Sequence, residues 1–368
     1  MAVVRWLKQN IVFCVAATAA AVTCFFVPPD TEYLTYFDWR TLICLFLTLA
    51  VVCALRNVKF FTIVARRLVR LSGNLRSLFL LLIAITFIGS MLIANDMALI
   101  TFLPLGYFAL SVTKQEKYMA YLFILQNISA NLGGMLTPFG NPQNLYLYSY
   151  FKIPTGEFCG IMLPPFLLAI TLLAMCCLPV KAAPLLIQDS FKERLNKKRT
   201  VFYLALFALS LLIVFRIVPA WIGLIVITVA LLWADREALL MVDYGLLGTF
   251  FFFFIFAGNL ARIEAVNQLL SGLLEKDALL VSILSCQGIS NVPTAILLSR
   301  FTTDYHSLLL GVNIGGTGTL IASLASLITF SEFRVLYPGH SKQYFWMFTG
   351  INVGFLVIMT VAAKLFFL

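Results

Sequence analysis

Charged residues are scarce in this chain of 368 residues: Asp, Glu, Lys and Arg together make up 11% of it, whereas hydrophobic residues make up 61%. A soluble domain carries about 25% charged residues, so the composition excludes an ordinary water-soluble fold. It predicts a polytopic integral membrane protein. The length allows roughly nine to eleven spans of about 20 residues each, with loops between them.

Motifs for catalysis are also missing. The two histidines, His306 and His340, stand alone, and the eight cysteines show no metal-binding spacing. Neither a nucleophile elbow nor an ATP-binding P-loop occurs. We therefore expect no enzyme and no cofactor beyond a coupling ion. The net charge of +10 is assigned to basic loops that fix membrane topology, so membrane lipid is an expected partner and nucleic acid is not.

Long apolar segments indicate where the chain crosses the membrane. Two of them are interrupted by polar residues, Leu78–Leu110 at Asn95-Asp96 and Ala278–Phe301 at Ser290 to Thr294. Each is predicted to form a hairpin that enters the membrane and returns, with a tip satisfied by protein or a water-filled cavity. Nine further segments are predicted spans: Ile11–Val27, Trp39–Leu55, Tyr118–Leu136, Glu157–Val180, Val201–Ile217, Ala220–Ala234, Tyr244–Gly258, His306–Phe330 and Gln343–Phe367.

The distribution of basic residues predicts the orientation. With the N-terminus in the cytoplasm, nineteen of the 26 Lys and Arg residues fall on the cytoplasmic side and seven outside. Such a bias is typical of membrane proteins. It predicts a cytoplasmic N-terminus, an external C-terminus, the first hairpin on the cytoplasmic side and the second on the outer side. We expect the protein in a bacterial inner (plasma) membrane.

The two halves of the sequence repeat the same order of features. A stretch beginning "FDWRTL" at Phe37 and one beginning "VDYGLL" at Val242 each contain a span, an amphipathic stretch, a hairpin and a span broken by Gly-Gly. The equivalent spans lie five spans apart, an odd number, so the repeats are predicted to be inverted. The predicted fold is an all-α polytopic membrane protein with an N-terminal repeat in residues 1–180, a cytoplasmic linker in residues 181–199, and a linking span and C-terminal repeat in residues 200–368.

The breaks themselves carry a shared frame, Asn-x-Gly-Gly-x-x-Thr. It occurs in "NLGGMLTPFGNPQN", Asn131 to Asn144, and in "NIGGTGTLIASLAS", Asn313 to Ser326. Each glycine costs a helix about 1 kcal/mol relative to alanine. A broken helix frees carbonyls that coordinate cations and N-termini that attract anions. A single Gly-Gly usually indicates close packing, but its repetition after two polar hairpin tips favours a binding site between inverted repeats.

Asp96 is the one acidic residue within the first hairpin's apolar core, and Val292 stands at the matching position of the second. An ionisable group at membrane depth is a functional-site hypothesis, often a proton or ion relay. The alternative is that Asp96 caps the second arm of the hairpin, because Asp is a favoured N-cap residue. The sequence leaves both interpretations open.

Four motifs resemble the ion transporter superfamily, which includes citrate-transporter-like permeases, divalent-anion/sodium symporters, arsenite permeases and sodium/proton antiporters. "ANDMALITFLPL" and "SNVPTAILL" are similar to the two hairpins of the arsenite-permease branch, and "GGMLTPFGNPQNLYLY" and "GGTGTLIASLASL" to the two Gly-rich breaks. Dicarboxylate symporters carry Ser-Asn-Thr at both tips, whereas the tips here read Ala-Asn-Asp and Ser-Asn-Val. This departure suits proton coupling or a smaller, less charged solute.

The resemblance implies a secondary active transporter, usually a homodimer, that moves a small anion by elevator-type motion coupled to sodium or protons. Efflux of arsenite-like oxyacids and sodium/proton exchange are the alternatives; an ion channel is less favoured, because no filter-like repeat or ring of like charge occurs. Sodium is expected at Asn95, Gly133, Asn291 and Gly315. The full candidate site for solute and ion comprises Asn95, Asp96, Gly133, Gly134, Thr137, Asn141, Asn144, Ser290, Asn291, Thr294, Gly315, Gly316, Thr317 and Thr319.

Overall fold

The computed structural model describes residues 11–185 and 195–368, and within them every regular element is a helix and no β-strand occurs. The predicted all-α class is confirmed. The N-terminal segment and the middle of the predicted linker lie outside the described residues. The main helices are α2 (Ile11–Phe26), α3 (Trp39–Asn57), α4 (Phe60–Val69), α5 (Leu75–Ile93), α6 (Asn95–Val112), α7 (Met119–Gly133), α8 (Pro142–Tyr150), α9 (Thr155–Cys177), α10 (Lys197–Val214), α11 (Ala220–Ala234), α12 (Arg236–Leu240), α13 (Tyr244–Arg262), α14 (Glu264–Ile289), α15 (Asn291–Leu298), α16 (Tyr305–Ile314), α17 (Leu324–Leu336) and α18 (Ser341–Ala362).

Six helical segments of the described chain are long and apolar enough to cross a membrane. They are α3, α5, α6, α9, α13 and the segment Pro338–Phe367 that contains α18. The predicted spans at α2 and α11 form shorter apolar helices of 16 and 15 residues. Both arms of the first predicted hairpin, α5 and α6, are among the six, so each arm alone has the length of a span.

Helices α3 and α13, which occupy matching places in the two halves of the sequence, begin in the same way. Asp38 caps α3 by accepting a hydrogen bond from the Thr41 backbone N–H (3.2 Å), and Asp243 caps α13 by accepting one from Leu246 (2.9 Å). Both helices contain 19 residues. A side-chain oxygen at the N-cap satisfies an N–H group that has no partner within the helix. The Asp residues of the two aligned stretches therefore fix the start of the same element in each half.

A single residue separates the helices of each predicted hairpin. Ala94 joins α5 to α6 with φ 66° and ψ 152°, and Ser290 joins α14 to α15 with φ 74° and ψ 159°. This backbone region is essentially confined to glycine, and another residue held there costs about 1–3 kcal/mol. The turns lie where the sequence predicts them. Because α14 is non-helical at Asp277, the arm that precedes Ser290 is shorter than the whole of α14.

The two predicted breaks also occur at the glycine pairs. Helix α7 ends at Gly133, and α8 begins at Pro142 after an irregular segment. Helix α16 ends at Ile314, and α17 begins at Leu324, capped by Ser323. Proline is well suited to the first turn of a helix because its missing N–H would be unpaired there in any case. Each Gly-Gly pair thus lies where one helix stops and a second begins a few residues later.

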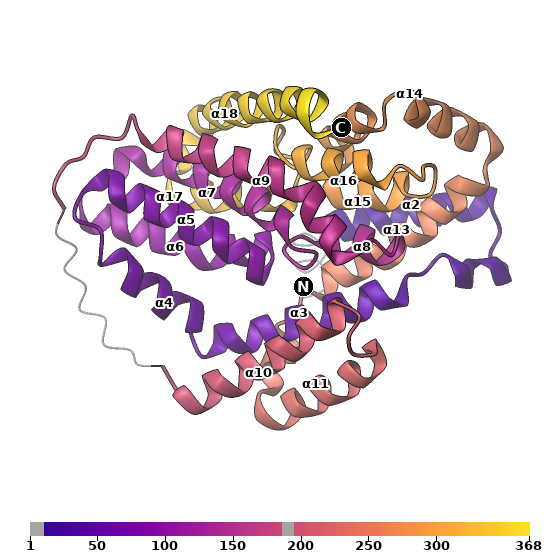
Figure 1. The fold of residues 1–368 in the computed structure, drawn as a ribbon, viewed down its shortest axis with the longest axis horizontal. Coiled ribbons are helices and arrows are strands. Elements are labelled where there is room, and N and C mark those ends of the chain that lie inside the picture. The colour runs from indigo at the N-terminus through magenta and orange to yellow at the C-terminus, as the bar shows by residue number, and fades with distance from the viewer. Residues whose placement is uncertain (1–10, 186–194) are drawn as a thin grey trace.

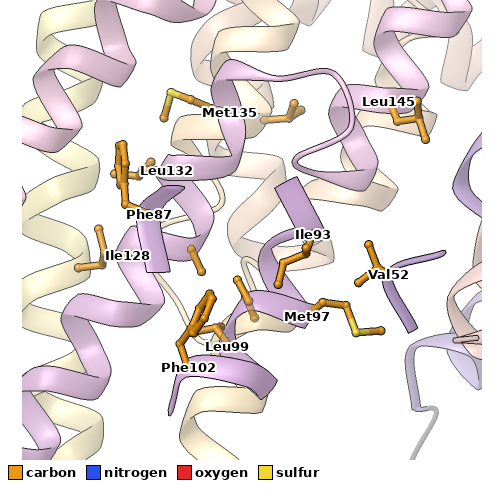
Figure 2. Packing of buried hydrophobic residues seen from close by; sticks show 14 of the residues in the cluster. Val52, Phe87, Ile93, Met97, Leu99, Phe102, Ile128, Leu132, Met135 and Leu145 are labelled. Atoms are coloured by element: carbon orange, nitrogen blue, oxygen red, sulfur yellow. The ribbon is translucent and has the colours of Figure 1, made fainter. Parts of the chain in front are cut away.

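Helix α3 connects two parts of the molecule. It packs against α10, α11 and α12 and also against α8, which follows the first break. Figure 1 shows α10 and α11 beside α3 at one side of the molecule, with α18 at the opposite side. Apolar side chains surround the turn between α5 and α6. Val52 of α3 faces Ile93 and Met97, and Phe87 packs beside Leu132 (Figure 2).

Two arginine side chains bind the segment that precedes the N-terminus of α3. The Arg262 guanidinium donates to Asp30 (2.7 Å) and to the Tyr36 hydroxyl (3.1 Å). That hydrogen bond to Arg262 is the main reason why the pKa of the Asp30 carboxyl lies below its usual value. Arg300 donates to the backbone carbonyl of Tyr36 and lies over the Tyr150 ring, 5.3 Å from its centroid. Arg300 thus connects the end of α15 to the loop before α3.

Candidate functional site

The asparagine at each helix–helix turn adopts the same arrangement. Asn95 Oδ1 accepts a hydrogen bond from the Asp96 N–H (3.0 Å), and Asn291 Oδ1 accepts one from the Val292 N–H (2.9 Å). The backbone N–H of Asn291 in turn donates to the Ala322 carbonyl (2.9 Å), in the segment between α16 and α17. Each amide therefore orients the first turn of the helix that follows it.

A chain of buried amides connects the first turn to both breaks. Asn95 Nδ2 donates to Asn131 Oδ1 (3.1 Å), and Asn141 Nδ2 donates to the Asn131 carbonyl (3.1 Å) and to Asn313 Oδ1 (3.3 Å). Asn313 Nδ2 then donates to Asn144 Oδ1 (2.6 Å). Residues far apart in the sequence, on α7, α8 and α16, thus meet in one network. We call Asn95, Asn131, Asn141, Asn144 and Asn313 the amide chain.

Other side chains satisfy the carbonyls that the breaks free. Asn144 Nδ2 donates to the carbonyls of Gly134 (3.3 Å) and Met135 (3.2 Å) in the first break. In the second, Gln287 Nε2 donates to the carbonyls of Gly315 (2.9 Å) and Thr317 (3.1 Å). These amides thus supply hydrogen-bond donors to carbonyls that the helix breaks leave without their regular helical partners.

The glycines allow the backbone to approach its neighbours closely. A Cβ atom on Gly133 would lie 2.3 Å from the Phe87 carbonyl oxygen of α5, and one on Gly134 would lie 2.3 Å from Asn141 Oδ1. A Cβ on Gly315 would lie 2.9 Å from the Cys286 side chain of α14, and one on Gly316 would lie 3.1 Å from Asn291 Nδ2. Gly133 and Gly315 thus pack against hairpin arms, whereas Gly134 and Gly316 border the amides.

The four candidate threonines donate to backbone carbonyls rather than to one another. Thr137 donates to Met91 (2.8 Å) and Thr294 to Ser290 (2.7 Å). The two threonines of the second break do the same. Thr317 donates to the Ile314 carbonyl (2.7 Å), and Thr319 donates to the Gln287 carbonyl (3.1 Å). These hydroxyls hold the turns and breaks in shape.

Asp96 lies beside the amide chain in the first turn of α6. Its backbone N–H is bonded to Asn95, but its side-chain Oδ1 is buried without a hydrogen-bond partner among the described residues. The N-cap position of α6 belongs to Ala94, and no side chain caps that helix. The structure therefore does not show the capping role that is the alternative for Asp96. A buried carboxylate oxygen without a partner is costly unless a proton, a cation or water satisfies it.

Two further polar atoms near the first turn lack partners in the described chain, Asn131 Nδ2 and Asn141 Oδ1. A cavity of about 10 Å³ adjoins Asn141 and is lined by Thr48, Ala94 and mostly apolar side chains. A water molecule needs a cavity of about 10–15 Å³. The space beside Asn141 is thus about the size of one water molecule.

Three members of the site are absent from the sequence-based candidates: Asn131, Asn313 and Gln287. The first two were indicated by the shared frame, in which each asparagine stands two positions before Gly-Gly. Gln287 gave no comparable signal, because it lies in an apolar stretch that has no glutamine at the matching place of the first hairpin, where Met91 stands. Within the described residues no group of three or more His, Cys, Asp and Glu could hold a metal ion.

The amino-acid sequence is similar to a known protein family and to two other proteins. Residues 1–307 match the profile of a family described as Citrate transporter. An uncharacterised transporter of Methanocaldococcus jannaschii is 32% identical, over 89% of this chain and 90% of that protein. An inner membrane protein of Escherichia coli is 29% identical, over 88% of this chain and 86% of its own length.

Proposed function

The chain belongs to the citrate transporter family of integral membrane proteins, and we propose that it is a secondary active transporter that moves a small carboxylate or inorganic oxyanion coupled to sodium or protons. The observation that carries this proposal is the amide chain. It lies where a helix turn with a polar tip meets two helix breaks, and it includes Asn141 and Asn313 from opposite halves of the sequence.

The chemistry of the site supports a small anion with a coupling cation. Helices α6, α8, α15 and α17 all begin at the turns or breaks, and a helix N-terminus carries partial positive charge that favours an anion. Within the described residues, the hydrogen bonds that form the amide chain join asparagines and involve neither Lys nor Arg. A solute held only by amides and helix ends suits a low charge. A cation bound beside it would neutralise that charge at membrane depth.

Asp96 is the titratable side chain of this site, and it is the candidate group for binding the coupling proton or sodium ion. Its partnerless Oδ1 would be satisfied by a proton or by sodium. The same observation favours a second candidate function, exchange of sodium for protons without an organic solute. Arsenite-like efflux remains the alternative for the solute, because an uncharged oxyacid would need no cationic side chain.

We further propose that the two halves are inverted repeats and that transport follows an elevator-type motion. The repeated order of capped helix, helix turn and broken helix supports the repeat. The proposed moving part contains both turns and both breaks, while α3, α10 and α11 lie to one side (Figure 1). The proposed orientation keeps the N-terminus in the cytoplasm, and the proposed assembly is a homodimer.

Reconstitution in proteoliposomes tests the function. Labelled monocarboxylates, dicarboxylates, phosphate and arsenite would be offered in turn under an imposed sodium gradient and an imposed proton gradient. We expect one solute class to accumulate under one gradient. Asn313→Ala is expected to abolish accumulation, whereas Asn267→Ala, in the part of α14 before Asp277, is expected to preserve it. Absence of solute uptake together with sodium-dependent proton flux would replace the proposal by the antiporter.

A further inference from the structure

Two arginines join the parts of the molecule that the proposed elevator-type motion would separate. Helix α8 follows the first break and α15 follows the second turn, so both belong to the proposed moving part. Arg216, in the loop between α10 and α11, donates a hydrogen bond to the Tyr148 backbone carbonyl in the last turn of α8. Arg300, just after α15, donates one to the Tyr36 backbone carbonyl in the loop before α3. Both contacts therefore connect the moving part to the helices that flank it.

The contact of Arg216 has two favourable features. Its guanidinium lies over the Tyr148 ring, 4.3 Å from the centroid. The carbonyl that it binds belongs to a helix C-terminus, where partial negative charge favours a cation. The backbone of Arg216 has φ 65°, a left-handed conformation that is uncommon for residues other than glycine. The contact made by its side chain gives a reason for an arginine at this position.

The flanking part holds Tyr36 in place for Arg300. The Tyr36 hydroxyl accepts a hydrogen bond from Arg262 at the end of α13 (3.1 Å), and a Cβ on Gly258 of α13 would lie 2.4 Å from the Tyr36 ring. The Arg300 Nε atom is buried without a hydrogen-bond partner among the described residues. An unpaired buried donor lowers the net stability that such a contact contributes. Arg300 thus binds a fixed carbonyl through a contact that can be released.

The ends of α8 and α15 are also joined to each other. The hydroxyls of Tyr146 on α8 and Ser299, next to Arg300, are hydrogen-bonded (2.7 Å), and both residues are buried. Both helices begin in the candidate site, α8 next to Asn141 and α15 at Asn291. They therefore run from the candidate site to the two arginine contacts, and we expect their ends to move together.

The opposite end of α3 is held to the moving part by weaker contacts. A cavity of about 260 Å³ lies between α3, α4 and α6, and Arg56, Arg66 and Thr101 are among the residues that line it. Arg56 donates to the Met97 thioether (3.1 Å), and sulfur is a weak acceptor. Arg66 lies over the Phe108 ring, 4.9 Å from its centroid. One end of α3 is thus near two arginine–carbonyl bonds, whereas the other end borders a cavity.

We propose that Arg216 and Arg300 together form a clamp that closes one end of the candidate site in this conformation and must release before that end opens. The inference rests on the elevator-type motion proposed above. On release, the moving part would shift along α3, so that the clamped end opens while the cavity beside Arg56 closes. Arginine suits this task because its guanidinium stays charged and forms charge-assisted hydrogen bonds.

Release of the clamp separates no ion pair. Neither arginine forms an ion pair with a carboxylate within residues 11–185 and 195–368. Asp38, the acid at the start of α3, accepts hydrogen bonds from the Thr41 backbone N–H (3.2 Å) and hydroxyl (2.7 Å). Breaking a hydrogen bond to a neutral carbonyl costs less than leaving a buried charge without its partner. The clamp can therefore open and close within a transport cycle.

Two introduced cysteines report on the two ends of α3 in the purified full-length protein. Thr48→Cys lies on α3 in the small cavity beside Asn141, and Thr101→Cys lies on α6 in the cavity beside Arg56. The rate at which each reacts with a water-soluble maleimide in detergent is measured by mass spectrometry of the labelled peptide. This readout distinguishes each introduced cysteine from the eight native ones.

The reporters are combined with variants of the clamp and with a matched control. Arg216→Gln and Arg300→Gln each remove one clamp contact. Arg216→Lys keeps the charge but not the planar guanidinium, which provides a further variant if Arg216→Gln folds poorly. Arg40→Gln is the control, because Arg40 is also half-buried and donates to the Ile213 carbonyl of α10 (3.0 Å), within the flanking part.

In the otherwise unchanged protein, Thr101→Cys should react faster than Thr48→Cys. We expect Arg216→Gln and Arg300→Gln to raise the rate at Thr48→Cys about tenfold, the loss of one charge-assisted hydrogen bond, and to lower the rate at Thr101→Cys. Arg216→Lys should have a smaller effect, and Arg40→Gln should change neither rate.

Opposite changes at the two reporters would indicate a shift between two conformations, whereas general loosening of the fold would raise both rates. The clamp is overturned if both rates rise together, if neither changes, or if Arg40→Gln acts as strongly as the clamp variants. Labelling requires no solute, so the clamp is tested even if the protein fails to accumulate any solute in proteoliposomes. Normal uptake with unchanged labelling would overturn the clamp and leave the transport function in place.

Discussion

The two helix breaks share one sequence frame but are stabilised by side chains from different places. In the first, the carbonyls after Gly133 are bonded by Asn144, which belongs to the helix that follows the break and also reaches Asn313. In the second, the carbonyls are bonded by Gln287 of the adjacent hairpin arm. The carbonyls of the first break are therefore bonded by an amide of the helix that follows it, whereas those of the second are bonded by an amide of its own hairpin arm.

The two helix turns differ in charge. Both place an asparagine on the N–H of the next residue, but that residue is Asp96 in the first turn and Val292 in the second. The asparagine and its hydrogen bond are thus common to both turns, and the side chain of the next residue differs. The carboxylate is an addition to one turn, which is the reason to seek the coupling ion there and not at its counterpart.

The largest effect is expected from the glycines that face the hairpin arms. A Cβ at Gly133 would meet the Phe87 backbone carbonyl at 2.3 Å, whereas one at Gly315 would meet the Gly311 backbone carbonyl at 2.7 Å and the Cys286 side chain at 2.9 Å. Overpacking costs about 1–3 kcal/mol. We place Gly133→Ala near the upper end, at about 3 kcal/mol, and Gly315→Ala near the lower, at about 1 kcal/mol, because the contact at Gly133 is the closer of the two. Thermal unfolding in detergent measures both.

Gly160→Ala on α9 serves as the control, because no atom lies within 4 Å of the added Cβ. It should not destabilise the protein, and it should add up to about 1 kcal/mol of stability because alanine is preferred to glycine in a helix interior. Equal losses of stability in Gly133→Ala and Gly315→Ala would show that the two breaks are packed equally tightly, which contradicts the expected difference.

Replacing the amide of Gln287 or Asn144 by a carboxylate tests how much each amide stabilises its break. In Gln287→Glu the two hydrogen bonds to the carbonyls of Gly315 and Thr317 are replaced by repulsion, which should cost about 2 kcal/mol. Asn144→Asp should cost a similar amount, but it should also weaken the contact with Asn313. Gln268→Glu, exposed on α14, is the control and should change stability by less than about 0.5 kcal/mol. If Gln287→Glu is as silent as this control, Gln287 does not hold the second break.

Asp96→Asn tests the charge difference between the turns. The variant keeps the shape of the side chain but removes the group that binds a proton or a cation. We expect gradient-driven uptake to fall about tenfold, equivalent to about 1.4 kcal/mol, with a smaller loss of equilibrium solute binding. Val292→Asn, which places the same amide in the second turn, should leave the coupling ion unchanged. Uptake under sodium and proton gradients, together with binding, measures all three quantities.

If Asp96→Asn matches wild type in all three measurements, the coupling ion is held without a carboxylate. Asn95, Asn291 and the backbone carbonyls of the breaks would then be its ligands, and the two turns would be functionally equivalent despite their different sequences.

Much of the fold could be predicted because its signals are local. The capping residues Asp38 and Asp243, the polar residues at the two turns and the Gly-Gly pairs each mark an element boundary, and helices begin or end there in the structure. A polar residue in an apolar run and a glycine pair in a helix act within a few residues of themselves. Their position in the sequence is therefore enough to locate a turn or a break.

Contacts between distant residues could not be predicted in the same way. Asn141 and Asn313 are separated by 172 positions yet are hydrogen-bonded, and no spacing in the sequence indicates that pair. Gln287 acts on a break that begins 28 residues later, and a lone glutamine in an apolar helix is equally compatible with several partners. A cavity lined by Arg56 of α3, Thr62 of α4 and Pro104 of α6 forms where these helices pack together, so no motif in the sequence indicates it.

The smallest effect is expected from the backbone of the turns themselves. Ala94 and Ser290 both have positive φ, 66° and 74°, which glycine adopts without steric cost. Ala94→Gly should stabilise the protein by up to about 1 kcal/mol, as strain relief exceeds the added freedom of the unfolded chain. Ser290→Gly should gain less, because the serine hydroxyl donates to the Ala322 carbonyl (3.3 Å). Thermal unfolding of both variants measures the difference.

Ala98→Gly, within α6 and buried, provides a control of opposite sign, since glycine in a helix interior costs about 1 kcal/mol relative to alanine. If Ala94→Gly is as destabilising as Ala98→Gly, the positive φ of the turn is not a source of strain. If instead Ala94→Gly raises the unfolding temperature while transport falls, the strained turn contributes to transport. A relaxed turn would then hold Asn95 less firmly against Asn131, and the second turn, which keeps a backbone bond to Ala322, should tolerate Ser290→Gly with a smaller loss of uptake.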